Sequence, residues 1–366
     1  MKKVLSVFLV ITMLFLSCSM AAFAVTNSDS ASAVRKAFKV ETDSSIYEYE
    51  YYYYSPVKGS GDKTKYPVIL WLHGQLSGDY PGDQIRQSDI AYLATAENQA
   101  KIKKAGGAFI LVPRYPTLNV NLAWVGENAT IKKFVDGFIA KHKANVDTNR
   151  IYVGGYSMGG KAAMSFAAAY PNYVAAIFPA SSIYLMASAQ ADMRSLVNTP
   201  IWFFTCKDDN FWGKPVPQTS DWNYLCSITN QKDSIRWTLF EKTLYNYDGS
   251  PILTIGYSEH NVWDPVLHDL IMKNGTMYPN MVTINGSGMK IDLSKDNSFL
   301  AWLSSQTLNG PVGDEGTDNP GEDDDSSGDI IGGGSSGIVF HSLKEILEYI
   351  VSLFDRLYKA LFTYDY

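Results

Sequence analysis

The chain has 366 residues, of which 46% are hydrophobic and 19% charged, enough apolar material for one large buried core or two small ones. Its formal net charge is −6, but eight acidic residues and no Lys or Arg lie between Asn309 and Ser342, so the rest of the chain is near neutral. The sequence contains no basic stripe and no nucleic-acid recognition motif, which argues against a nucleic-acid partner.

The first residues have the pattern of an export signal. Two lysines precede an apolar run from Val4 to Leu16, and Ala22-Phe23-Ala24 supplies small residues where a signal peptidase cuts. The run is too short for a stable membrane-spanning helix. We predict a signal peptide over residues 1–24, a mature start at Val25 and a secreted or extracellular protein, with attachment to the cell surface left open.

Strand and helix patterns alternate along the first part of the mature chain. Continuous apolar runs are typical of strands buried on both faces, and segments with helical spacing separate them. This alternation predicts the α/β class: a doubly wound, mostly parallel sheet whose ligands bind beyond the carboxyl ends of its strands. In chain order, the predicted elements are a Tyr-rich strand at 47–54, a strand at 66–72, a helix at 90–104, a strand at 108–113, a helix at 131–142, and strands at 151–156, 174–181 and 200–205.

The turn at Ser157 is central to the predicted function. An apolar strand pattern runs into Gly155, Ser157 and Gly159, and an Ala-rich helical pattern follows, which predicts a sharp strand-to-helix turn with the serine at its apex. Gly155 and Gly159 are the flanking positions that must be small. The turn also puts the Met158 N–H at a helix N-terminus, where it can stabilise an oxyanion. A simple capping serine is the alternative, but it gives no reason for four glycines around one serine.

A nucleophilic serine needs an imidazole base, and the base needs an orienting carboxylate. Doubly wound hydrolases place these residues in the order Ser, Asp, His. Two of the five histidines precede Ser157, and His341 lies beyond the linker predicted at residues 309–338, which leaves His260 and His268. His260 lies in a turn-like segment after a predicted strand, whereas His268 falls in a predicted helix. We therefore expect His260 to be the base.

The acid and the second oxyanion donor are expected in two other loops. Asp208 and Asp209 follow a predicted strand, and either carboxylate could reach the imidazole; the offset from the strand end favours Asp208. The loop after the strand at 66–72 is expected to supply the backbone N–H of Gln75 to the oxyanion hole, with His73 and Gly74 shaping the turn.

Two cysteines remain after export, Cys206 and Cys226. They could form a disulfide in an oxidising compartment, or they could be two buried free thiols, and the sequence favours neither alternative. No second cysteine or histidine lies at metal-ligand spacing from either one. We expect no metal and no cofactor.

Beyond residue 233 the pattern changes to β-hairpins, with predicted turns at Asp248-Gly249 and Asn285-Gly286. A last helix is predicted at "NSFLAWLSSQ", so the catalytic domain is expected to span residues 25–308.

Two further segments follow the predicted catalytic domain. Residues 309–338 have the composition of an acidic Gly/Ser-rich linker. Residues 339–366 carry apolar side chains at intervals of three and four, which predicts an amphipathic helix. Such a helix could bind a membrane surface, a partner or itself.

Four stretches in this order carry a resemblance to a known group: "WLHGQLSG", "DTNRIYVGGYSMGGKAA", "FFTCKDD" and "SEHNVWDP". Over residues 47–306 the chain resembles the secreted α/β-hydrolases of the feruloyl-esterase, polyhydroxybutyrate-depolymerase and predicted-peptidase group. The resemblance implies Ser157 as nucleophile, Asp208 as acid and His260 as base, with Trp263 packing behind the histidine. The chain departs from the group at residues 204–206, Phe-Thr-Cys, where His-Gly usually stands before the acid.

The sequence therefore predicts an exported serine carboxylesterase. Its expected substrates are small-molecule esters or acetyl and feruloyl esters of plant polysaccharides. A serine peptidase of the same fold is one alternative, because both reactions use the same acyl transfer. A non-catalytic carbohydrate-binding module on a hydrolase scaffold is another, and Phe211-Trp212 and Trp222 are compatible with sugar stacking.

Overall fold

The computed structural model describes residues 34–75, 77–115, 124, 126–182, 194–209, 219–241, 244–252, 258–293, 298–308 and 310. The chain divides into two compact units, residues 1–314 and 315–366, and every described residue belongs to the first. The predicted signal peptide, the linker beyond residue 310 and the C-terminal amphipathic helix lie outside the described residues and stay predictions. No helix in the described ranges is long and apolar enough to cross a membrane.

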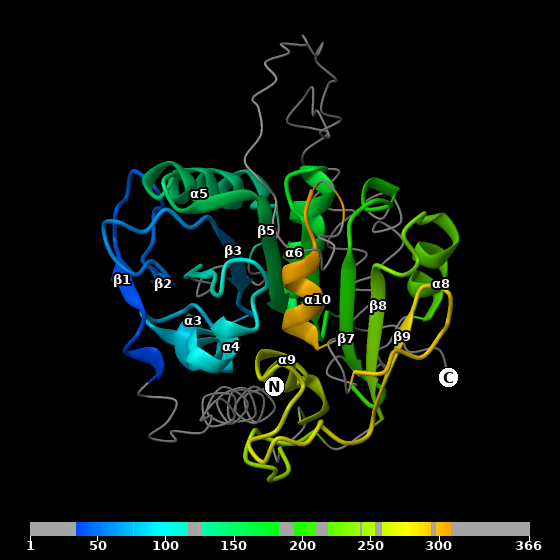
Figure 1. The fold of residues 1–366 in the computed structure, drawn as a ribbon. Helices are drawn as coiled ribbons and strands as arrows, with labels where there is room; N and C mark the ends of the chain where they lie inside the picture. The colour runs from blue at the N-terminus through cyan, green and yellow to red at the C-terminus, as the bar shows by residue number, and fades with distance from the viewer. Residues whose placement is uncertain are drawn as a thin grey trace, which may run out of the picture. The chain divides into compact units, whose positions relative to one another are not determined.

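Strands and helices alternate as the sequence predicts (Figure 1). Their bounds are β1 Lys39–Glu41, β2 Tyr51–Tyr54, β3 Tyr66–Leu72, α3 Asp83–Arg86, η1 Asp89–Ala94, α4 Ala96–Ala100, β4 Phe109–Pro113, α5 Asn128–Lys141, β5 Val146–Tyr156, α6 Met158–Ala169, β6 Ala176–Ala180, β7 Ile201–Cys206, α8 Thr219–Ile228, β8 Ile235–Phe240, η2 Ser258–His260, α9 Trp263–Leu267, β9 Met281–Asn285 and α10 Phe299–Ser305.

A single nine-stranded sheet organises these elements, with strand order β1-β2-β4-β3-β5-β6-β7-β8-β9. All neighbours from β4 to β8 pair in parallel. The strands toward the two edges, β1, β2 and β9, pair antiparallel. The predicted doubly wound, mostly parallel sheet is confirmed, and the carboxyl ends of β3, β5, β6 and β7 lie at one edge.

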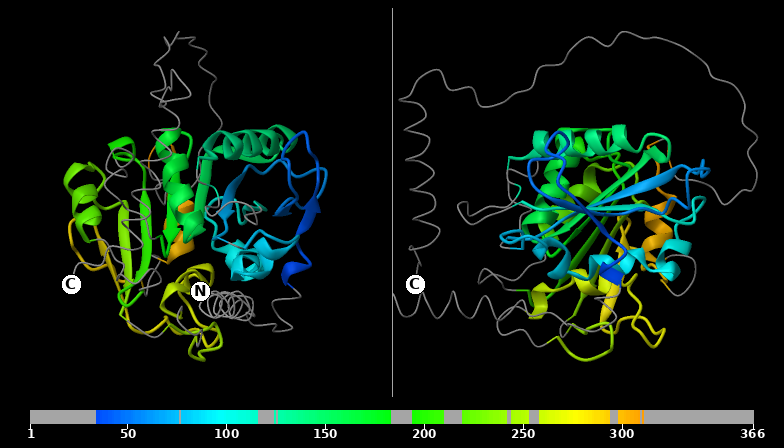
Figure 2. Two further views of the ribbon diagram at one scale, coloured as in Figure 1. Left: turned by 180° about the vertical axis from the view of Figure 1, so that it is seen from behind. Right: turned by 90° about the vertical axis from the view of Figure 1, so that its left-hand side faces the viewer.

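Two hydrophobic cores form, one on each face of the sheet. One contains apolar side chains of α5, α6 and α8, and the other contains those of η1, α9 and α10. In Figure 1 α10 lies in front of the sheet and α6 behind it, and the two views of Figure 2 agree. The central strands are therefore buried on both faces, as their continuous apolar runs predict.

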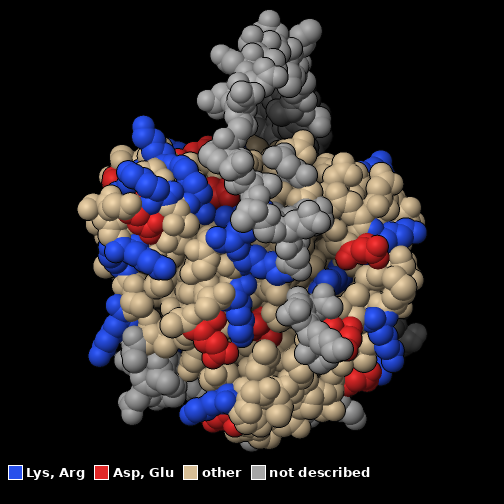
Figure 3. Space-filling view, in the orientation of Figure 1, with Lys and Arg blue, Asp and Glu red and all other residues tan. Residues whose placement is uncertain are grey.

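On the face in Figure 3 acidic and basic side chains are interspersed.

Two local predictions need correction. The single helix expected at 90–104 is two short helices, η1 and α4, because Thr95 between them is extended (ψ 147°) and its hydroxyl caps α4 by accepting from Asn98 N–H. The hairpins predicted beyond residue 233 are also smaller than expected. Their turns are closed by isolated bridges, Tyr245–Pro251 and Ile284–Lys290, whereas β8 and β9 pair with each other and β8 joins the parallel sheet.

Candidate active site

Ser157 occupies the turn between β5 and α6, and its backbone is strained. Its φ of 54° and ψ of −118° are values that non-glycine residues rarely adopt. A Cβ added to Gly155 would lie 2.5 Å from the carbonyl carbon of Gly159, and one added to Gly159 would lie 2.0 Å from the Leu72 carbonyl oxygen. Both positions must therefore be small, as predicted. Met158 is the first residue of α6, so its N–H lies at the helix N-terminus.

The carboxylate that meets His260 belongs to Asp209, so the predicted choice of Asp208 is wrong. His260 Nδ1 lies 2.8 Å from Asp209 Oδ2, and both side chains are buried. Asp208 is exposed. The physical reason is the tight turn after β7, in which the Asp209 N–H donates to the Cys206 carbonyl over 3.2 Å and the second carboxylate turns inward. An ionised Asp209 accepts the Nδ1 proton, which leaves a lone pair on Nε2.

The backbone of His260 is tied to the edge of the sheet that carries Ser157. The Ser157 N–H donates to the Ala180 carbonyl and the Ser181 N–H to the Phe204 carbonyl, each over 2.9 Å. The fully buried Ser181 hydroxyl then donates to the carbonyl of His260. The sequence analysis did not identify this residue. The available signal was its place directly after a buried strand, at the edge where ligands bind.

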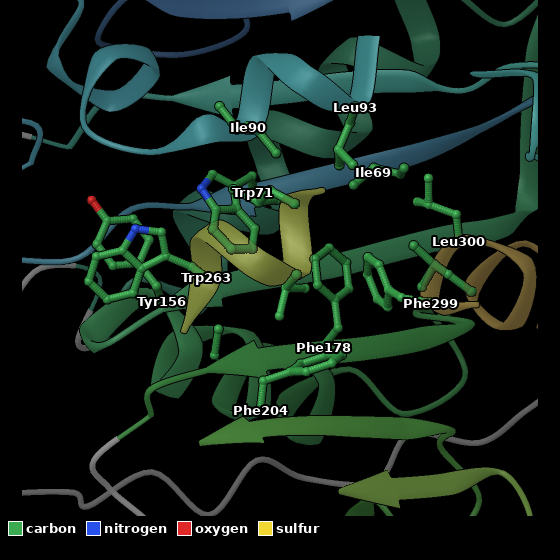
Figure 4. Packing of buried hydrophobic residues seen from close by; sticks show 14 of the residues in the cluster. Ile69, Trp71, Ile90, Leu93, Tyr156, Phe178, Phe204, Trp263, Phe299 and Leu300 are labelled. Carbon is green, nitrogen blue, oxygen red and sulfur yellow. The ribbon is translucent and has the colours of Figure 1, made fainter. Parts of the chain in front are cut away.

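An aromatic contact also links the histidine to the nucleophile turn. The Trp263 ring lies edge-on to the His260 ring, with 5.6 Å between centroids, as the resemblance implies. The Trp263 ring also contacts that of Tyr156, the residue before Ser157, with 4.2 Å between centroids. Figure 4 shows the Tyr156 and Trp263 rings side by side. The start of α9 therefore contacts both the His260 ring and the ring of Tyr156, which precedes Ser157.

The loop after β3 lies against the nucleophile turn. A Cβ on Gly74 would lie 3.4 Å from the Ser157 Cβ and 2.6 Å from the Tyr156 ring, so only glycine allows this approach. Gln75 follows at the same edge and is half-buried. The backbone N–H groups of Gln75 and Met158 thus belong to the two segments that flank Ser157, and their role as oxyanion donors stays a prediction.

His73 is a structural residue of this loop. Its Nδ1 lies 2.6 Å from the Gly74 carbonyl oxygen, and its Nε2 accepts the Tyr115 N–H at 3.0 Å. These partners require a proton on Nδ1 only, and complete burial lowers the pKa of His73 to about 4. The Trp124 indole N–H also donates to the His73 carbonyl, over 3.0 Å. Because the Gly74 carbonyl and the Gln75 N–H share one planar peptide group, His73 also orients that N–H.

The structure also describes the two cysteines and one of the aromatic sites that the sequence singled out. Cys206 and Cys226 are both free thiols, and burial raises the pKa of Cys206 to about 11. Trp222 is buried with its ring 5.5 Å from that of Trp237, which makes it a core residue and not a sugar platform. Phe211-Trp212 lies outside the described residues. No group of three potential metal ligands occurs in the part of the chain that the structure describes.

The α/β-hydrolase fold is defined by the sheet order and by the strained serine after β5. The buried Asp209–His260 pair fits that fold. The Dienelactone hydrolase family model matches residues 123–221, which contain Ser157 and Asp209. The resemblance to the α/β-hydrolase superfamily is confirmed.

One of the solved structures that are similar to the chain supports the same fold. A thermostable esterase superposes with a TM-score of 0.50 at 20% identity, over 75% of this chain and 64% of its own, so the chain spans less than two thirds of that esterase. An acetyl xylan esterase from Aspergillus awamori is similar at TM-score 0.34 and 15% identity, over 52% of this chain and 77% of its own. An acylaminoacyl peptidase from Pyrococcus horikoshii is similar at TM-score 0.41 and 16% identity, over 60% and 39%. No curated protein matches the sequence.

Proposed function

We propose that the protein is a serine carboxylesterase with Ser157 as nucleophile, His260 as general base and Asp209 as the orienting acid. The observation that carries the proposal is the strained Ser157 turn, linked through Ser181 to the backbone of a histidine whose Nδ1 meets a buried carboxylate. A serine held at unfavourable dihedral angles costs stability, and such strain is found preferentially at functional sites.

The first half of the reaction forms an acyl-enzyme. Ser157 Oγ attacks the ester carbonyl carbon while His260 Nε2 accepts the hydroxyl proton. Asp209 stabilises the resulting imidazolium through Nδ1–H. The Met158 and Gln75 N–H groups hold the negative charge that develops on the carbonyl oxygen. When the intermediate collapses, the C–O bond to the alcohol breaks and the imidazolium gives its proton to the leaving oxygen.

The second half uses the same groups in reverse. His260 Nε2 accepts a proton from water as the water oxygen attacks the acyl carbon, and the second intermediate forms in the same oxyanion hole. Its collapse breaks the bond to Ser157 Oγ, which recovers the proton from the imidazolium. The products are a carboxylic acid and an alcohol, and the chain supplies every acid and base that the cycle needs.

The substrates that we propose are acetyl, feruloyl or other small acyl esters, including those on plant polysaccharides, cleaved outside the cell. Export is supported by the pattern of residues 1–24. The ester assignment is supported by the family match over the nucleophile and acid segments.

The experiment is labelling of the purified mature protein with a fluorophosphonate, with wild type beside Ser157→Ala. Turnover of acetyl, butyryl and feruloyl esters and of matched anilides follows. We expect labelling that Ser157→Ala abolishes, together with ester turnover. Faster cleavage of the anilides than of the esters would favour a serine peptidase. An unlabelled wild type would rule out the serine hydrolase and favour a binding role.

A further inference from the structure

A second buried carboxylate–imidazole pair lies on the helix that follows the candidate base. His268 Nε2 is 2.8 Å from Asp89 Oδ2, and both residues are buried. His268 ends α9, whereas Asp89 begins η1, so the pair joins two helices that are 179 residues apart in the sequence. The proposed reaction uses neither residue.

Two tyrosine rings hold the imidazole of His268 in one orientation. Tyr247 stacks on it with 4.0 Å between centroids and 10° between planes. Tyr92, on η1, contacts it at 4.1 Å. The ring therefore has little freedom to rotate, and its Nε2 is directed at Asp89.

A second carboxyl group, that of Asp264, completes the cluster. Asp264 lies one turn before His268 on α9, as the backbone bond from the His268 N–H to the Asp264 carbonyl shows (3.2 Å). Its side chain accepts the Asp89 backbone N–H. Burial and the neighbouring Asp89 carboxylate raise the pKa of Asp264 well above its usual range. One helix thus contacts the start of η1 through two side chains on one face.

Helix α9 carries this attachment to the candidate active site. It is only five residues long, and Trp263 at its start contacts the His260 ring at 5.6 Å and the Tyr156 ring at 4.2 Å. A displacement of α9 at His268 would therefore be transmitted through about one and a half turns to the base.

Stability alone is a weak reason for such a cluster. Burying ionisable groups costs desolvation free energy, and apolar residues of similar volume often stabilise a protein as much or more. Directional hydrogen bonds, in contrast, fix the position of a short helix more narrowly than apolar packing alone. At an active site a misplacement of 1 Å can cost about 10²-fold in rate.

We propose that Asp89 and His268 are positioning residues of the esterase, which hold α9 so that His260 stands at the correct depth over Ser157. The inference rests on the proposed function, because position affects rate only if His260 is the base. Neither residue touches the reacting atoms. Their effect is therefore expected in kcat and in the rate of Ser157 labelling, and not in KM.

The test compares two replacements of His268 in the mature protein. His268→Phe keeps a flat ring between the tyrosines but removes the donor to Asp89, whereas His268→Gln keeps an N–H donor near the place of Nε2. The matched controls are His142→Phe and His142→Gln. His142 is also packed against an aromatic ring, that of Phe138 at 4.3 Å, but it is half-buried and lies at the end of α5, beside the other core.

Fluorophosphonate labelling is measured per folded molecule, so partial unfolding of a variant does not mimic a slower reaction. We expect His268→Phe to lower kcat and the labelling rate by roughly tenfold or more, as a misplaced base should, with KM within twofold of wild type. His268→Gln should recover most of the rate, and both His142 variants should match wild type. If His268→Phe poorly populates the folded state, Asp89→Asn tests the same pair and should lower the same two rates.

The outcomes separate the two proposals. Wild-type rates in His268→Phe and Asp89→Asn beside an active wild type overturn the positioning role alone. So does a loss of kcat in His268→Phe that His268→Gln does not repair. A wild type that neither labels nor hydrolyses esters overturns the proposed function, and this inference with it.

Discussion

Replacing Asp209 with asparagine removes the charge at the centre of the candidate site with little change in shape. Asp209 is completely buried, and its Oδ2 lies 2.8 Å from His260 Nδ1. If the new amide turns its NH₂ toward Nδ1, the imidazole must carry its proton on Nε2, where it cannot accept the Ser157 proton. Because a general base contributes roughly 10²–10⁴-fold, we expect kcat/KM to fall by that factor, which raises the barrier by about 3–5 kcal/mol.

The neighbouring residue supplies the control. Asp208→Asn makes the same chemical change one position earlier, at an exposed side chain, and should leave kcat/KM within about twofold of wild type. The assay is hydrolysis of p-nitrophenyl acetate by the three proteins, with thermal unfolding measured beside it. Equal activity of the two variants, or a loss confined to Asp208→Asn, would refute the assignment of the acid.

Three further outcomes are expected. Gly159→Ala should lose about 2 kcal/mol or more of unfolding free energy in urea, because its Cβ would meet a backbone oxygen at 2.0 Å, whereas Gly61→Ala, with nothing within 4 Å, should be neutral. A neutral Gly159→Ala would contradict the turn geometry. Burial lowers the pKa of His73 from 6.5 to about 4. Between these two pH values the unfolded chain binds a proton that the folded protein does not. The part of the unfolding free energy that this difference supplies is fully present above pH 6.5 and is lost as pH falls toward 4. His73→Gln should remove about 3 kcal/mol of that pH dependence, measured by unfolding at pH 7 and pH 4; an unchanged pH dependence would mean that His73 is protonated in the fold. Ser181→Ala should lower kcat by roughly tenfold without changing KM, because it removes a hydrogen bond worth about 1 kcal/mol that holds the His260 backbone; a change in KM alone would refute this.

Local patterns were sufficient for the nucleophile turn and for the type of fold. The glycines around Ser157 act through contacts with residues near in the chain or on the adjacent strand, so their small size can be recognised in the sequence. Strands such as β3 and β7 are buried along their whole length, which leaves a continuous apolar run. The structure pairs each of the two candidate histidines with a buried aspartate, His260 with Asp209 and His268 with Asp89, and the choice of His260 as base stays a prediction.

The split of the predicted helix at 90–104 was not recognised, although Thr95 carries a signal for it. A threonine whose hydroxyl can cap the next turn competes with helix continuation. The pairing of β8 with β7 had no comparable signal, because parallel strands are joined across long connections and their register depends on the whole sheet.

By itself the sequence determined the alternation of strands and helices through β7 and the serine turn, because both depend on residue types over short spans. Only the tertiary structure decided which of two adjacent aspartates faces inward, since one residue in a tight turn reverses the direction of a side chain. It also decided that both cysteines are free and that His268 joins Asp89. Those outcomes depend on distances between segments far apart in the chain, which only the packed fold brings together.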